Sequence, residues 1–170
     1  EKNLLLPKKL NMKILGIGNA IVDVICKVED NFIDQNNLTK STMKLFFDEN
    51  EFKNLLTNLK IEKTVSGGSV ANSIVGLSQL GDKVGFIGKV SDDEFGGKYE
   101  EGLKKENVKY FYLKKKEELP TGTCLILVTP DSERTMCTFL GTAGKINEND
   151  VNSDAIKRSE IIFLEGYLWD

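Results

Sequence analysis

Two kinds of apolar pattern alternate along the chain. Continuous apolar runs, which are typical of strands buried on both faces, lie at residues 13–17, 84–88 and 161–164. Apolar residues spaced three to four positions apart predict three helices. The first covers residues 49–59, the second begins within residues 66–69 and ends near residue 80, and the third covers residues 95–107. A shorter helix is expected over residues 150–159, with Asn149 or Asp150 as its N-cap.

Strict alternation marks residues 20–28. Val22, Val24 and Cys26 fall on one face of the predicted strand, and Asp23 falls on the other beside isoleucines. An unpaired carboxylate is costly in such surroundings. Further short strands are predicted at residues 43–47 and 110–113. Residues 123–129 and 135–140 are predicted to form a hairpin, with its turn at residues 130–133.

Strands that alternate with helices predict an α/β fold with a parallel sheet flanked by helices. The half-polar strands predict a small antiparallel sheet beside it. Residues 1–12 carry no helical or strand period and are interpreted as an N-terminal extension. The rest of the chain, residues 13–170, shows no internal repeat and no low-complexity linker.

The composition excludes several kinds of catalytic site, metal site and binding partner. The chain has 170 residues and no histidine, which excludes imidazole bases, Ser-His and Cys-His dyads and His-ligated metals. A net charge of −3 does not favour nucleic acid as a partner. No apolar run approaches the length that spans a bilayer, and the three cysteines form no C-x-x-C pair. A soluble cytoplasmic protein without a membrane partner is expected.

Two glycine-rich segments are candidates for ligand contact. The segment Gly16–Ile21 lacks the third glycine of the dinucleotide fingerprint, and a predicted strand follows it where that fingerprint needs a helix. The phosphate loop G-x-x-x-x-G-K-[ST] is absent. Gly67 and Gly68 stand at a predicted helix start, where free N–H groups bind oxygens, and Asn72 lies one turn further on. A plain turn and helix cap is the alternative interpretation.

The motifs occur in a fixed order: Gly18-Asn19 with Asp23, then Gly67-Gly68-Ser69-Val70-Ala71-Asn72, then Gly81, then Phe86–Gly96. This order and spacing, from about Lys13 to the chain end, resembles the ribokinase/PfkB carbohydrate kinase family. The spacing of Asn19 and Asp23 and the Gly-Gly-Ser before Asn72 are most similar to the adenosine kinase branch. Val70, Ile74 and Ser91 depart from the common pattern, which bears on the branch rather than on the family.

The resemblance implies a Rossmann-like α/β domain with a β-sheet lid over the acceptor site. The lid strands would lie within about residues 20–47 and 121–141. By position in the family, the substrate-binding residues would be Asn19, Asp23, Gly67, Gly68, Asn72 and Glu165. No catalytic or metal-binding residue is expected in this chain.

Family members are nearly twice as long, and their D-T-x-G-A-G-D and N-x-x-E segments are not found here. The resemblance therefore implies the N-terminal, substrate-binding half of an ATP-dependent kinase for a ribonucleoside or sugar hydroxyl. ATP and Mg²⁺ would be bound mainly by the other half, and this chain alone would be inactive. The alternative is a non-catalytic nucleoside- or sugar-binding module. A homodimer through the lid strands is also compatible with the pattern.

Overall fold

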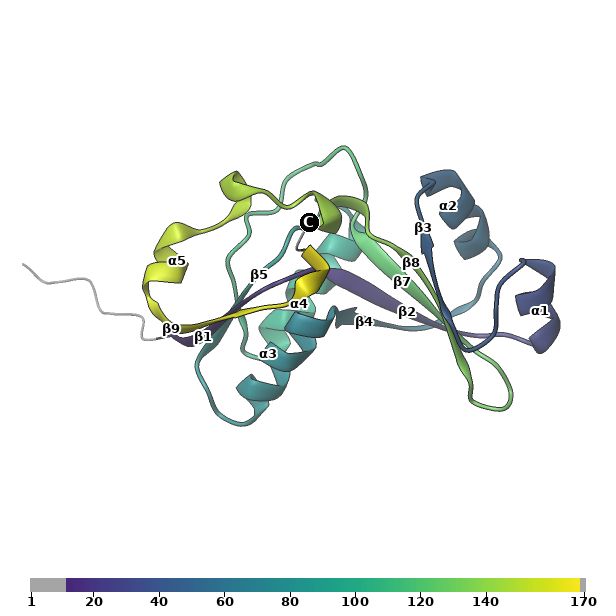
Figure 1. Ribbon diagram of the computed structural model, residues 1–170, viewed down its shortest axis with the longest axis horizontal. Coiled ribbons are helices and arrows are strands. Elements are labelled where there is room, and N and C mark those ends of the chain that lie inside the picture. Colours follow the sequence, from purple (N-terminus) through teal and green to yellow (C-terminus); the bar gives the residue numbers. More distant parts are fainter. Residues whose placement is uncertain (1–11, 169–170) are drawn as a thin grey trace, which may run out of the picture.

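The computed structural model describes residues 12–168 and contains two sheets. Sheet A is wholly parallel, with strand order β6-β5-β1-β9. Its strands are β1 (Met12–Ile17), β5 (Val84–Ile87), β6 (Lys109–Tyr110) and β9 (Ser159–Leu164). Figure 1 shows β1 running directly toward the second sheet, so the two sheets lie end to end.

Helices cover both faces of sheet A. The helix α3 (Ser69–Gln79) packs on β1 and β5, α4 (Glu94–Lys105) contacts β6 and the second sheet, and α5 (Ser153–Lys157) packs on β9. Apolar side chains of α3 meet Phe86 in the main core, whereas Ala155 of α5 meets Leu15 and Ile87 in a separate cluster. Successive strand residues point to opposite faces, so α3 and α5 lie on opposite faces of the sheet. The predicted α/β class is confirmed.

Sheet B has the strand order β3-β8-β7-β2-β4. Its strands are β2 (Ile21–Lys27), β3 (Met43–Phe46), β4 (Ile61–Gly67), β7 (Gly122–Val128) and β8 (Arg134–Phe139). The pairs β2–β4 and β7–β8 are antiparallel, but β2–β7 and β3–β8 are parallel. A second, smaller sheet was predicted as antiparallel, and the structure shows it as mixed. Long connections bring β2 beside β7, and only the β7–β8 hairpin is joined by a tight turn.

The outer face of sheet B is covered by α1 (Asp30–Gln35) and α2 (Glu49–Thr57), at the end of the molecule opposite α5 (Figure 1). Val22, Val24 and Cys26 are at most 1% exposed on this face, as the alternation predicted. Phe52 of α2 stacks on Phe139 of β8, with ring centroids 5.6 Å apart. This face of the sheet is therefore occupied by the chain itself, and the opposite face carries Asp23.

Some elements differ from their predictions. The strand β4 and the six-residue helix α1 were not predicted, and β6 is two residues long where residues 110–113 were expected. The last helix begins at Ser153 with Asn152 as its cap, and Asp150 instead belongs to the 3-10 turn η2 (Glu148–Asp150). Two more 3-10 turns are η1 (Gly141–Lys145) and η3 (Gly166–Leu168). Of the predicted extension 1–12, residues 1–11 lie outside the described residues, and Met12 already belongs to β1.

Candidate functional site

The candidate site lies where the two sheets meet. At this junction lie the carboxyl ends of β1 and β9 and the N-terminus of α3. The strand β2 begins here and β4 ends here, and both belong to sheet B. Ligands of open parallel sheets bind at the carboxyl ends of the strands, so this junction is the expected position of a binding site.

Asp23 lies on the open face of sheet B, between Val65 of β4 and Cys124 of β7 in the strand register. Its side chain is half-buried, and no described residue makes a hydrogen bond or ion pair with its carboxylate. Burial raises the pKa of Asp23 to about 6, because removing water disfavours the charged form. A carboxylate held in this state is prepared to accept hydrogen bonds from a ligand.

The wall beside Asp23 is apolar. Ile21, Cys124 and Ala143 are buried together, with Ile126 and Leu140 packed against them. Burial raises the pKa of the Cys124 thiol to about 11, so the thiol is neutral, and the Thr138 hydroxyl lies 3.2 Å from its sulfur. The wall can therefore contact the carbon skeleton of a ligand whose hydroxyl groups face Asp23.

Gly67 and Gly68 form the turn from β4 into α3, and both positions exclude a side chain. A methyl group at Gly67 would overlap the Asp23 carboxylate, and one at Gly68 would overlap the backbone carbonyl of Asn19. Gly68 also has φ +96°, a left-handed conformation that favours glycine. The Tyr99 hydroxyl of α4 donates a hydrogen bond to the Gly67 carbonyl at 3.2 Å, which ties this turn to α4. The structure thus brings Gly67, Gly68, Asn19 and Asp23 into contact.

The two candidate asparagines differ in their surroundings. The Oδ1 atom of Asn19 is fully buried and has no hydrogen-bond partner among the described residues. A buried acceptor without a donor is costly, so a ligand donor next to it would relieve that cost. Asn72 lies on the exposed side of the first turns of α3, where its backbone N–H closes the helix on the Gly68 carbonyl at 2.8 Å.

Glu165 follows β9 and reaches the same junction. Its carboxylate accepts a hydrogen bond from the hydroxyl of Ser69, the first residue of α3. Negative charge is favoured at this position by the free N–H groups of the helix N-terminus. All six predicted binding residues are therefore gathered around one turn of chain, although their contacts with a substrate stay predictions.

Sequence reasoning missed a buried ionic cluster next to the site. The Lys89 side chain is 6% exposed, and its Nζ lies 3.0 Å from Asp150 and 3.3 Å from Glu117. Burial alone would lower the pKa of Lys89, but its hydrogen bonds and the two carboxylates raise that pKa above the usual value. The cluster joins the loop after β5 to the loop before β7 and to η2. A lysine in a strand–loop–helix sequence gives no local signal that it will be buried.

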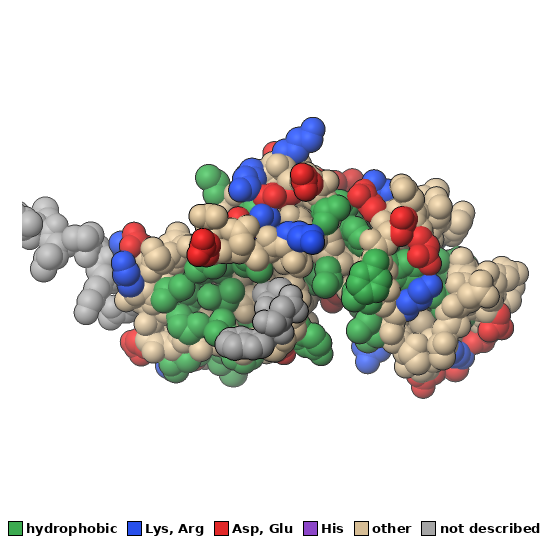
Figure 2. Space-filling model, turned by 45° about the horizontal axis from the view of Figure 1, so that its top comes forward, with side chains coloured by type: hydrophobic (Ala, Val, Ile, Leu, Met, Phe, Trp, Pro, Cys, Tyr) green, Lys and Arg blue, Asp and Glu red, His purple; other side chains and the backbone are tan. Residues whose placement is uncertain are grey.

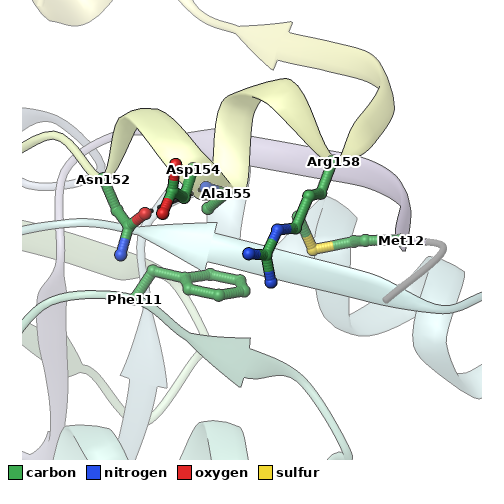
Figure 3. Close-up of a pocket in the computed structure, with 6 residues that line it drawn as sticks. All are labelled: Met12, Phe111, Asn152, Asp154, Ala155 and Arg158. Carbon is green, nitrogen blue, oxygen red and sulfur yellow. Dashed lines mark hydrogen bonds between the residues drawn. The ribbon is translucent and has the colours of Figure 1, made fainter. Parts of the chain in front are cut away.

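A separate cleft of about 200 Å³ opens at the amino ends of β1 and β9 (Figure 3). Its lining residues come mostly from α5 and its flanks: Met12, Phe111, Asn152, Asp154, Ala155 and Arg158. Its position at the opposite end of the strands separates it from Asp23. Among residues 12–168, no group of three or more acidic or thiol side chains is placed to hold a metal ion.

The fold combines a parallel sheet flanked by helices with a second, mixed sheet, and the candidate site lies at their junction. Residues 13–170 match the pfkB family carbohydrate kinase profile, and the chain belongs to that family. The predicted family is confirmed. In the part of the chain that the structure covers, no helix is long and apolar enough to cross a membrane.

Solved structures of similar proteins include both nucleoside and sugar kinases. An adenosine kinase from Sinorhizobium meliloti shares 34% identity and a TM-score of 0.82, covering 94% of this chain and 49% of its own. A probable sugar kinase from Rhizobium etli CFN 42 shares 34% identity and a TM-score of 0.83, covering 94% of this chain and 48% of its own.

A curated relative is a 5-dehydro-2-deoxygluconokinase from Mesomycoplasma hyopneumoniae (strain 232). It is 31% identical over 122 residues, which are 71% of this chain and 36% of the relative. The chain thus spans about a third of that relative's length and about half of the two solved structures.

Proposed function

We propose that this chain is the acceptor-binding, N-terminal half of an ATP-dependent kinase that phosphorylates a hydroxyl group of a ribonucleoside or sugar. The observation that carries this function is the half-buried Asp23 carboxylate, which is unpaired among the described residues and lies against Gly67 at the junction of the two sheets. Hydroxyl groups of an acceptor can donate to this carboxylate, and charged hydrogen bonds of this kind are strong.

The neighbouring residues have complementary roles in this proposal. Asn19 Oδ1 accepts one more hydrogen bond from the acceptor, and the Gly67-Gly68 turn lets the acceptor approach the backbone of α3. The neutral wall of Ile21 and Cys124 contacts its carbon skeleton and excludes water, which would otherwise compete for the phosphoryl group. Asn72 and Glu165 border the same space at the first turns of α3.

ATP and Mg²⁺ are assigned mainly to a region outside these 170 residues. Bound Mg²⁺ would neutralise charge on the transferring phosphoryl group, which is the main chemical requirement of phosphoryl transfer. The D-T-x-G-A-G-D and N-x-x-E segments, which the family resemblance ties to the base, magnesium and phosphate, are not found in these 170 residues. We therefore expect the 170-residue chain to bind acceptor without turning over ATP. Its three buried free thiols fit a reducing compartment, and we place the activity in the cytoplasm.

The first experiment is the intact mass of the protein purified from its source. A mass well above 19.0 kDa, followed by ADP release with nucleosides or sugars, supports the kinase. Both acceptor classes belong in the panel, because the adenosine kinase and the probable sugar kinase are equally identical to the chain. In the active protein, Asp23→Ala is expected to raise KM and to lower kcat/KM by about 100-fold or more.

The matched control is Asp34→Ala, which removes an exposed aspartate from α1. Unchanged kinetics in Asp23→Ala would remove the acceptor-binding role of that residue. The second candidate is a non-catalytic nucleoside- or sugar-binding module, for which the unpaired Asp23 carboxylate and the orphaned Asn19 Oδ1 atom would provide the same acceptor contacts. A natural mass of 19.0 kDa with acceptor binding and no ADP release would establish it.

A further inference from the structure

A fully buried tyrosine of α4 is bonded to the glycine turn of the candidate site. Tyr99 is 0% exposed, and its hydroxyl donates a hydrogen bond to the Gly67 carbonyl at 3.2 Å. Burial raises the pKa of Tyr99 well above its usual value, so the hydroxyl stays protonated and keeps its hydrogen for this bond. Any effect of Tyr99 on a bound acceptor therefore passes through the Gly67-Gly68 turn.

The ring of Tyr99 is held in place by other aromatic side chains. Its centroid lies 6.2 Å from that of Phe86 in β5 and 6.0 Å from that of Tyr110 in β6. Both neighbours belong to sheet A, whereas Gly67 is the last residue of β4 in sheet B. Tyr99 thus fixes the end of a sheet B strand relative to sheet A.

A second hydrogen bond joins Tyr99 to the same strand. The Ser66 hydroxyl donates to the Tyr99 backbone carbonyl at 3.0 Å. Gly102 of α4 permits this close approach, because a methyl group there would overlap the Ser66 hydroxyl. Two consecutive residues, Ser66 and Gly67, are therefore both bonded to Tyr99, one to its backbone and one to its side chain. This double contact fixes the direction of the chain as it leaves β4.

The position of Gly67 matters because it lies against Asp23. A methyl group at Gly67 would overlap the Asp23 carboxylate, so the backbone of Gly67 is one wall of the space around that carboxylate. Gly67 also forms the last pair between β4 and β2, with Ile21. Because a peptide group is planar, holding the Gly67 carbonyl also sets the orientation of the Gly68 N–H.

The junction that holds the candidate site is open at the surface. Figure 2 shows a hollow between the part of the molecule that contains sheet A and the part that contains sheet B, with apolar side chains on both sides. Tyr99, in contrast, belongs to the main core. An acceptor can therefore reach the junction, while the residue that anchors the turn stays out of its reach.

We propose that Tyr99 is a positioning residue of the acceptor site, whose hydroxyl sets the distance between the Gly67-Gly68 turn and the Asp23 carboxylate. This role rests on the proposed acceptor-binding function. Without the hydroxyl, the end of β4 loses its side-chain anchor to α4, and the turn is no longer held in one position. The space around Asp23 is then less well prepared for the acceptor, which weakens binding.

The variant Tyr99→Phe removes the hydroxyl and keeps the ring. In the natural protein, we expect KM for the acceptor to rise about 5-fold, which is a typical effect of one neutral hydrogen bond. We expect kcat to stay within about 2-fold of the parent value, because an interaction lost equally from bound substrate and transition state changes KM alone. ADP release with adenosine, ribose and fructose measures both constants.

The matched control is Tyr110→Phe, which removes the same group from the same aromatic cluster. The Tyr110 hydroxyl also donates to a glycine carbonyl, that of Gly88 at 2.6 Å, but it makes no contact with the Gly67-Gly68 turn. Both variants should lower the urea midpoint by similar amounts. A purely structural role of Tyr99 predicts equal KM changes for the two variants, whereas the positioning role predicts the 5-fold rise for Tyr99→Phe alone.

Hydrogen exchange tests the hold on the turn without any acceptor. The Asn72 amide donates to the Gly68 carbonyl at 2.8 Å and therefore reports on the turn. In the natural protein, NMR should show it exchanging about 5-fold faster in Tyr99→Phe than in Tyr110→Phe, because the unanchored turn opens more often.

Equal exchange of the Asn72 amide in the two variants would overturn the positioning role, and so would equal KM values. The proposed function fails separately, if the natural protein releases no ADP with any of the three acceptors. The exchange comparison then still supports or overturns the hold of Tyr99 on the turn, since it needs neither an acceptor nor ATP.

Discussion

Asp23 should make the protein less stable at neutral pH than an uncharged residue would. Its pKa is 3.8 in the unfolded chain and about 6 in the folded protein. Since the folded state binds its proton more tightly, the cost is absent below the unfolded pKa and grows as pH rises from about 4 to 6. A shift of about 2 units corresponds to up to about 3 kcal/mol at pH 7.

The variant Asp23→Asn removes the charge and keeps the shape of the side chain. We expect it to be more stable than the parent chain at pH 7.5, by up to about 3 kcal/mol, and the gain to vanish near pH 4. Urea unfolding followed by far-UV circular dichroism, between pH 4 and 8, measures the difference. Asp34→Asn, at an exposed position in α1, makes the same change in net charge and is the matched control.

Parallel stability curves for the parent and Asp23→Asn across this range would refute the reasoning. They would mean that the carboxylate is solvated or paired in solution, contrary to its half-buried and partner-free position among the described residues. A stabilising variant that also loses acceptor binding would have a direct functional meaning. Groups that cost stability and persist at a junction of this kind are characteristic of binding sites.

Two further predictions concern the backbone turn and the buried lysine. Gly68→Ala should destabilise the protein by about 1–3 kcal/mol in urea unfolding, because its φ of +96° is strained for alanine, and an unchanged midpoint would contradict this. Lys89→Met should destabilise the protein by up to about 3–5 kcal/mol, because Glu117 and Asp150 lose their buried cation and keep only the exposed Lys115, 3.7 and 4.0 Å away. Lys13→Met, which removes an exposed ion pair, is the control, and equal effects of the two lysine variants would count against a buried cluster.

The sequence predicted elements whose pattern is strong over several residues. The alternation in β2 identified both its buried face and the unusual position of Asp23, and the spacing in α3 and α4 fixed their inward residues. The strand β4 was missed because it is an edge strand with six exposed or half-exposed polar and apolar residues before its final glycine. Mixed pairing in sheet B was missed because the partner of β2 is set by tertiary packing rather than by local pattern.

The site was predictable in its residue types but not in its contacts. Glycine spacing indicated Gly67 and Gly68, the family resemblance indicated Asp23, and the structure brings the three residues together. The orphaned Oδ1 atom of Asn19 and the hydrogen bond from Ser69 to Glu165 depend on residues far apart in the chain. The burial of Lys89 depends likewise on two loops that meet only in the folded protein.

The parallel pairing of β2 with β7 also governs when the site can form during synthesis. Asp23 has Cys124 as its register neighbour, and β1 has β9 as one of its two partners. A nascent chain that has not yet released β7 from the ribosome cannot complete the sheet around Asp23, whatever the state of the earlier helices. Long-range strand pairing of this kind is slow. The candidate site therefore cannot take shape before β7 has emerged, and nascent chains shorter than about residue 128 should lack it.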